Sequence, residues 1–224
     1  MTIRIGTVCE GLTDHVIIGK ILEFYNGVNG ENIQPSSDRS SLDGGWTNVH
    51  KWCAHYIEME NPIFDYDLDK NFFDFILIHL DSDIYEKIID KYYKKKTGFN
   101  RTEHQDRYDL VLHTIIKWLN NQTKKIIFCI AVDSIEAWIY ASIIPDRDCE
   151  SFFAIQRRLA NVAYPLLYGR DAPPEIKSLK KNQDVYSRLS GLLNCDNISA
   201  CCAHFIDLVE QLMRISVPLD KDRR

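Results

Sequence analysis

Long hydrophobic runs are missing from this sequence of 224 residues, whose longest apolar segment, Ile126 to Val132, has seven residues. A membrane-spanning helix needs roughly 18 or more, so we expect no membrane span. The seven cysteines include no CxxC pair, which is typical of reduced thiols rather than of a disulfide framework. No charged and then apolar signal segment follows Met1, and we therefore expect a cytoplasmic protein.

Nucleotide-binding and zinc-binding motifs are missing as well. The glycines between Gly6 and Gly11 form neither a phosphate-binding loop nor a dinucleotide fingerprint, so ATP and NAD sites are not predicted. Cys201, Cys202 and His204 lack the spacing of zinc ligands, and helix packing explains them better. The chain also contains no internal repeat and no low-complexity tract.

The formal net charge is −5, which argues against a nucleic-acid partner because domains that bind nucleic acids tend to be basic. The charge is unevenly distributed, however. Residues 1–83 hold 14 acids and 5 bases, whereas residues 84–224 hold 18 acids and 22 bases. Because an acidic part is joined to a basic part, the net charge does not exclude a nucleic-acid partner.

Residues 87–107 form the most basic segment, with seven bases and three acids. It contains Lys94-Lys95-Lys96 together with the aromatic residues Tyr92, Tyr93 and Phe99. Bases interleaved with rings suit a nucleic-acid backbone and unpaired bases. A solvated, mobile loop explains the composition equally well, and the sequence does not decide between them.

The predicted secondary structure alternates between strands and helices. Strands are predicted over residues 3–9, 72–80 and 125–132, where β-branched and apolar residues concentrate. Helices are predicted after a cap at Thr13 or Asp14, over 49–57, 84–93, 108–119 and 135–144, and near 150–163, 183–193 and 198–214. This order predicts an α/β fold with a mostly parallel, Rossmann-like sheet and right-handed crossovers. We expect residues 1–145 to form this domain and residues 146–224 to form a helical C-terminal extension packed on it.

Acidic residues follow each of the three predicted strands. Glu10 ends the first, Asp81 and Asp83 end the second, and Asp133 ends the third, with Glu136 close behind. The carboxyl ends of parallel strands share one edge of a sheet, where ligands bind. Residues i and i+2 of an extended segment also point the same way. Crowded carboxylates either take up protons or hold a cation, and all-oxygen ligation favours Mg²⁺ or Mn²⁺.

Helix capping is the alternative explanation for several of these acids. The segments 83–86 and 133–136 both fit capping boxes, and acids in a first helical turn are stabilised by the helix dipole. Capping does not account for Asp81, which lies on the strand side of its turn. It also does not explain why three separate strands end alike.

Two motifs resemble the Toprim domain of topoisomerases, primases and OLD-family nucleases: Cys9-Glu10-Gly11-Leu12-Thr13-Asp14 after the first strand and Leu80-Asp81-Ser82-Asp83 after a central one. The segment Asp133-Ser134-Ile135-Glu136-Ala137-Trp138 is similar to the third acidic motif of small stand-alone Toprim proteins related to OLD nucleases. The resemblance covers roughly residues 1–145.

This resemblance implies a Mg²⁺- or Mn²⁺-dependent nuclease with two metal ions. Glu10 would be a metal ligand or a general acid/base, and Asp81 and Asp83 would hold Mg²⁺. Asp14, Asp133 and Glu136 would complete a second metal position. Two such ions can activate water and stabilise the leaving oxygen in phosphodiester cleavage.

The resemblance further implies a lysine downstream of the third motif that neutralises charge in the transition state. The candidates are Lys177, Lys180 and Lys181. The sequence favours Lys180 without deciding among them, and a solvated helix face explains the same lysines.

Toprim proteins of this kind often accompany a separate ATPase in prokaryotic anti-phage systems. The expected function is hydrolysis of DNA or RNA, and the alternative is a non-catalytic Toprim-fold subunit that docks an ATPase or another partner. The strandedness of the substrate, the oligomeric state and any need for a partner stay open.

Overall fold

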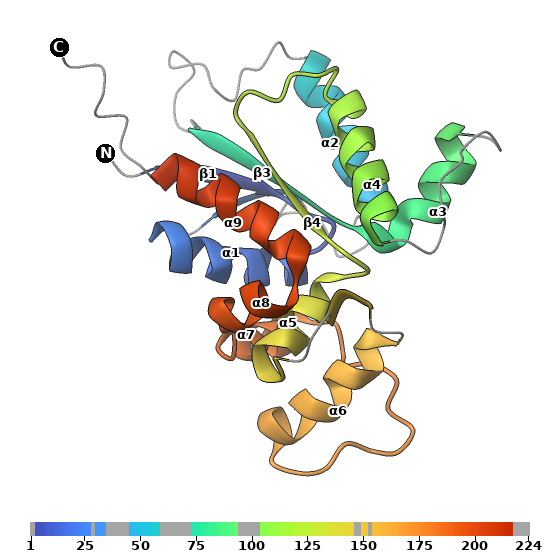
Figure 1. The fold of residues 1–224 in the computed structure, drawn as a ribbon, viewed down its shortest axis with the longest axis vertical. Helices are drawn as coiled ribbons and strands as arrows, with labels where there is room; N and C mark the ends of the chain where they lie inside the picture. Colours follow the sequence, from blue (N-terminus) through green and yellow to red (C-terminus); the bar gives the residue numbers. More distant parts are fainter. Residues whose placement is uncertain are drawn as a thin grey trace.

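The computed structural model describes residues 3–27, 30–34, 45–58, 73–93, 104–145, 149–151 and 154–216. Within them the chain forms a four-stranded, all-parallel sheet in the order β2-β1-β3-β4 (Figure 1). The strands are β1 (Ile5–Val8), β2 (Glu31–Gln34), β3 (Phe75–Asp81) and β4 (Ile126–Ala131). The predicted α/β class with a parallel sheet is confirmed, and the architecture is compatible with a Rossmann-like fold.

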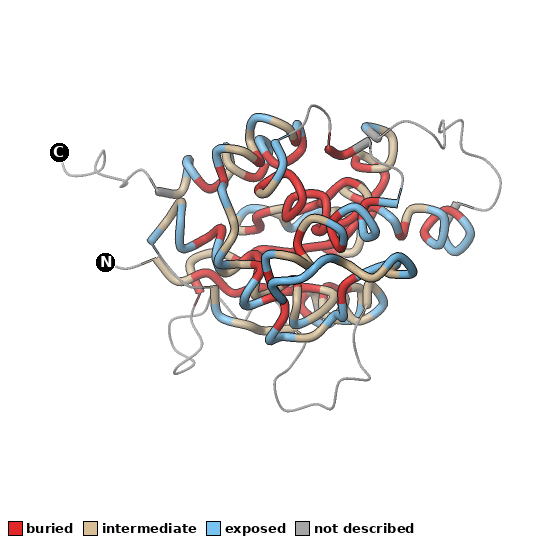
Figure 2. The backbone as a smooth tube through the Cα atoms, turned by 90° about the horizontal axis from the view of Figure 1, so that it is seen from below, coloured by how far each residue is buried: buried red, intermediate tan, exposed pale blue. Residues whose placement is uncertain are grey.

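Helices cover both faces of the sheet. One side carries α1 (Leu12–Asn26), α5 (Ile135–Ile143), η4 (Cys149–Ser151), α6 (Ile155–Tyr168), α7 (Gln183–Ser190), α8 (Cys195–Cys201) and α9 (Ala203–Ser216). The other side carries α2 (Trp46–Glu58), η2 (Ser82–Ile84), α3 (Tyr85–Ile88), the π-helical turn η3 (Ile89–Tyr93) and α4 (His104–Trp118). Figure 2 shows the resulting burial, with the most buried backbone in the middle of the molecule.

Alternating strand residues build the two cores. Leu77 of β3 packs in the core with α1 and α5, whereas Ile76 and Ile78 pack in the core with α2 and α4. Burying one side chain of this size stabilises the fold by about 1.5–3 kcal/mol. Because both faces of β3 are buried, consecutive residues are apolar, and the strand is a continuous apolar run in the sequence. The same alternation directs His79 and Asp81 to the α1/α5 side.

The C-terminal helix packs directly on the sheet. Gln211 of α9 reaches β4, where its Oε1 accepts the Phe128 N–H at 2.9 Å and its Nε2 donates to the Phe128 carbonyl at 3.0 Å. Helices after residue 146 also share one hydrophobic cluster with α1 and α5. The domain boundary at residues 145 and 146 stays a prediction.

Three predicted helices differ from the observed ones. The segment 198–214 is two helices, because Cys202 is extended and Asn194 caps a separate α8. The helix expected near 150–163 runs past Pro165 to Tyr168, since Leu167 continues its buried stripe. The segment 84–93 divides into 3-10, α and π turns.

No helix in the described ranges has the length and apolar composition needed to cross a membrane.

The basic run Lys94-Lys95-Lys96 and Phe99 lie outside the described residues. Both interpretations of that segment therefore stay open.

A buried charged network ties α9 to η4 and α4. Nδ1 of His204 lies 2.8 Å from Oε2 of Glu150, and Nε2 of His204 lies 3.1 Å from Oε1 of Gln105. The Gln105 amide is oriented by its Nε2, which donates to Asp109 at 2.9 Å. Both ring nitrogens of His204 therefore face acceptors, an arrangement that favours the ring with a proton on each nitrogen. Burial opposes this charge, but the hydrogen bond and charge of Glu150, with Asp207 and Asp109, raise the pKa of His204.

We predict that the charged form of His204 stabilises the fold at low pH. Because its pKa is raised, this stabilisation is complete below the ordinary histidine value and disappears as the pH rises through the folded-state value. His204→Gln should lower the free energy of unfolding by about 3 kcal/mol at pH 6, because it leaves Glu150 buried without its partner. Urea unfolding between pH 5.5 and 9 measures both effects.

The matched control is His113→Gln, which alters an exposed histidine whose Nδ1 bonds the Asp109 carbonyl of its own helix. The control should keep the wild-type pH dependence. Equal pH slopes for His204→Gln and the wild type would contradict the assignment.

Candidate functional site

Four acidic side chains gather where β1 and β3 end and where α1 and α5 begin. Glu10 follows β1, Asp14 lies in the first turn of α1, Asp81 ends β3, and Glu136 lies in the first turn of α5. Asp14 and Asp81 are buried, with 6% and 8% of their surface exposed, and Glu136 is only 2% exposed. The charges of these four acids affect one another's pKa values, so the four lie near one another. A metal site formed by them stays a prediction.

Asp81 joins the two strand ends and the helix behind them. Its backbone N–H donates to Oε1 of Glu10 at 3.1 Å. Its own Oδ1 accepts the N–H of Ile135, the first residue of α5, at 2.9 Å. Nε2 of the fully buried His79 lies 3.4 Å from the same oxygen.

The N-termini of α5 and α1 are capped by other residues than the sequence predicts. Ser134 is the N-cap residue of α5 and makes no side-chain cap bond, so the acceptor comes from Asp81 on another element. The expectation that capping does not account for Asp81 is therefore wrong, because Asp81 caps a helix that is distant in the sequence. Gly11 is the N-cap residue of α1, which makes the expected cap at Thr13 or Asp14 wrong. Asp14 lies in the first turn of α1, where its carboxylate accepts a hydrogen bond from the backbone N–H of Gly11, and it also lies inside the cluster.

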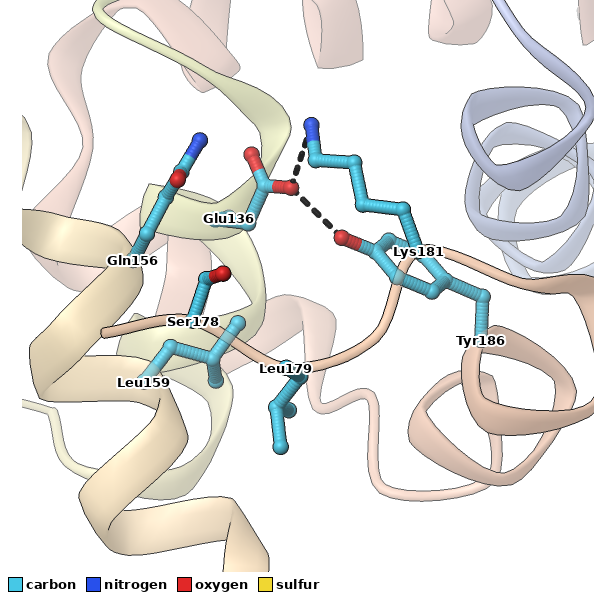
Figure 3. Close-up of a pocket in the computed structure, with 7 residues that line it drawn as sticks. All are labelled: Glu136, Gln156, Leu159, Ser178, Leu179, Lys181 and Tyr186. Atoms are coloured by element: carbon cyan, nitrogen blue, oxygen red, sulfur yellow. Dashed lines mark hydrogen bonds and ion pairs between the residues drawn. The ribbon is translucent and has the colours of Figure 1, made fainter. Parts of the chain in front are cut away.

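Glu136 is held by two donors on one of its oxygens (Figure 3). Nζ of Lys181 lies 2.8 Å from Oε1, and the hydroxyl of Tyr186 donates to the same oxygen at 2.5 Å. Oε2 is buried and has no hydrogen-bond partner among the described residues. Glu136, Lys181 and Tyr186 line a small pocket together with Gln156, Leu159, Ser178 and Leu179.

Burial and mutual repulsion raise the pKa values of three carboxyl groups of the cluster. Burial, followed by the charge of Asp81, raises the pKa of Glu10 to about 8. Burial also raises the pKa of Asp81 to about 7, although the hydrogen bond and charge of His79 oppose the change. Burial raises the pKa of Asp14 as well, against the charges of His79 and Lys181.

Glu136 behaves in the opposite way. Burial would raise its pKa, but the charge and hydrogen bond of Lys181 and the hydrogen bond of Tyr186 outweigh burial, so the pKa is lowered. The pKa of Lys181 is raised for the reciprocal reason: burial lowers it, and the charge of Glu136 overcomes that effect. The pair is therefore ionised at neutral pH.

Asp83 and Asp133 are placed differently from the expectation. The chain turns into η2 directly after Asp81, so Asp83 is exposed and the argument from an extended i, i+2 pair is wrong. Asp133 has a left-handed backbone (φ 59°), and its Oδ1 lies 2.6 Å from the Arg107 guanidinium on α4. Asp83 remains near the cluster: burial raises its pKa, with Lys87 and Lys181 lowering it and Glu136 and Asp133 raising it.

The lysine that reaches the acids is Lys181. Lys177 and Lys180 are exposed, whereas Lys181 makes the ion pair with Glu136 and feels the charges of Asp81 and Asp14. Lys181 therefore replaces Lys180 as our candidate.

The chemistry of this set fits a divalent cation. Its donors are carboxylate oxygens, which Mg²⁺ and Mn²⁺ prefer, and the buried Oε2 of Glu136 is left for a further partner. In the described part of the chain, no group of three or more His, Cys, Asp or Glu side chains could hold a metal ion in the observed arrangement. The Lys181 ammonium is the cation that faces Glu136 in this structure.

Sequence reasoning missed Tyr186 and left His79 as an interior histidine. His79 is indeed buried, with Nδ1 2.9 Å from the Cys129 carbonyl, and it also contacts the site through Asp81. Tyr186 is one of 11 tyrosines and lies 50 residues from Glu136 in the chain. No local motif marks it.

In comparisons with known proteins, no family model, no curated protein and no solved structure matches this chain. The candidate function therefore rests on the residues and the geometry.

We predict that ionisation of Glu10 destabilises the fold between about pH 5 and 8. Its pKa is raised to about 8, so the folded state holds a proton that the unfolded state releases near its ordinary value, and stability falls as the pH rises through this window. One such proton corresponds to about 1.4 kcal/mol per pH unit. Glu10→Gln should flatten this part of the stability profile in metal-free urea titrations.

Glu175→Gln, which changes an exposed carboxyl, is the control and should leave the profile unchanged. A Glu10→Gln variant with the wild-type slope would show that this carboxyl ionises normally.

Proposed function

We propose that this protein is a Mg²⁺- or Mn²⁺-dependent nuclease of the Toprim type that hydrolyses phosphodiester bonds in DNA or RNA. The observation that carries the proposal is the convergence of Glu10, Asp14, Asp81 and Glu136 beside Lys181 at one edge of a parallel sheet. Ligand sites lie at such edges in open α/β folds.

In this proposal the metal ions, the carboxylates and Lys181 have separate roles. Bound metal ions would activate water and stabilise the leaving oxygen. The four clustered carboxylates would hold them, with Asp83 and Asp133 at the margin. Glu10 would serve either as one of these metal ligands or as the general acid/base that takes up and returns a proton. The ammonium of Lys181 would stabilise negative charge on the phosphate.

Two exposed arginines lie on the helix that contributes two residues to the pocket. Gln156 and Leu159 of α6 line the pocket, and the exposed Arg157 and Arg158 lie between them in the sequence. Exposed arginines are residues that contact a phosphate backbone in nucleic-acid complexes.

The biological setting is part of the proposal through the resemblance to OLD-related Toprim proteins. That setting is a cytoplasmic anti-phage system in which a separate ATPase is the partner. All seven cysteines are free thiols, as this location would require.

We predict that the purified protein nicks or cleaves plasmid DNA or RNA when Mn²⁺ is added. Asp81→Asn should reduce the rate by about 100-fold or more, since losing a ligand charge costs several kcal/mol in the transition state. Asparagine keeps the Oδ1 that accepts the Ile135 N–H, so the start of α5 stays capped. The measurement is gel electrophoresis over a Mn²⁺ series.

Asp171→Asn removes an exposed acid outside the site and should cleave at the wild-type rate. Equal cleavage by Asp81→Asn and the wild type would contradict the nuclease assignment.

We predict that Lys181, rather than its neighbour, assists cleavage. Lys181→Gln should slow cleavage by about 10- to 100-fold, because it removes a charge-assisted contact worth about 1.5–3 kcal/mol. Lys180→Gln should change the rate less than twofold, since Lys181 and not Lys180 makes the ion pair with Glu136. The reverse ranking, measured under single-turnover conditions, would return the role to Lys180.

A non-catalytic docking subunit is the second candidate. Two internal ion pairs, Lys181 with Glu136 and Arg107 with Asp133, already neutralise two of the acids, as a purely structural cluster would need. Calorimetry separates the candidates: binding of Mg²⁺ or Mn²⁺ at millimolar concentrations supports the nuclease, and its absence supports the docking subunit.

A further inference from the structure

The two oxygens of Glu136 have opposite surroundings. Oε1 receives both the Tyr186 hydroxyl and the Lys181 ammonium, whereas Oε2 has no partner among the described residues and is buried (Figure 3). A carboxylate oxygen offers about two lone-pair sites, and both sites of Oε1 are taken. A further ligand can therefore approach only Oε2.

We propose that Tyr186 is a positioning residue that holds Glu136 so that Oε2, and only Oε2, is presented to a divalent cation. This inference rests on the metal-dependent function proposed above. It adds a residue from α7, outside the segment 1–145, that acts on the metal through Glu136.

Tyr186 is better suited than Lys181 to fix the orientation. Its side chain is 2% exposed and packs in the hydrophobic cluster with α1 and α5, so its ring has little freedom. The side chain of Lys181 is 49% exposed and has four rotatable bonds to order.

Loss of this hydroxyl would free the carboxylate. The terminal torsion of glutamate is broad and roughly two-fold, so without the Tyr186 contact Lys181 could draw Oε2 toward itself. Partners that orient metal ligands typically change metal affinity by about 10- to 100-fold.

The experiment measures Mn²⁺ binding to the full chain by calorimetry and by the electron paramagnetic resonance signal of free Mn²⁺. Tyr186→Phe, which keeps the ring, should raise the Kd for Mn²⁺ by about 10-fold. Tyr164→Phe is the matched control, because the Tyr164 hydroxyl contacts Arg170 on the surface, and it should keep the wild-type Kd.

A double-mutant cycle separates positioning from general stability. If Tyr186 acts through Glu136, adding Tyr186→Phe to Glu136→Gln should leave the Kd of the single Glu136→Gln variant unchanged. An unchanged Kd in Tyr186→Phe, or additive effects in the cycle, would overturn the positioning role and leave the nuclease proposal standing. Absence of Mn²⁺ binding by the wild type would overturn both.

Discussion

Repulsion among buried carboxylates is the constraint on which the rest of this site depends. Glu10, Asp14 and Asp81 are crowded where solvent is largely excluded, and the pKa of each is raised. Such an arrangement persists only when protons or cations offset the charge. Lys181 does this for Glu136, and His79 lowers the cost for Asp81. The remaining acids stay available for protons or for a divalent ion.

The central strands and the acids at their ends could be predicted because local patterns determine them. Apolar runs predicted β3 and β4, and the alternation of strands and helices predicted a parallel sheet. Glu10 and Asp81 follow from that topology, because parallel strands end at one edge. Asp83 did not follow, since the turn at Ser82–Ile84 breaks the extended geometry that the prediction assumed.

The contributions of distant segments could not be predicted. Neighbouring lysines at 180 and 181 look alike in sequence, and only the path of the chain into α7 decides which one reaches Glu136. The Tyr186 contact depends on the packing of α7 against α1, which no local pattern encodes. Asp133 turned toward Arg107 because its left-handed backbone redirects the side chain.

The bonds between Gln211 and Phe128 also have a consequence for assembly. An outer strand normally exposes amide and carbonyl groups that can recruit a strand from another molecule. At Phe128 a single glutamine side chain satisfies both groups, as a neighbouring backbone would. The sheet is closed to further growth at that position by its own last helix, so any partner strand must first displace α9.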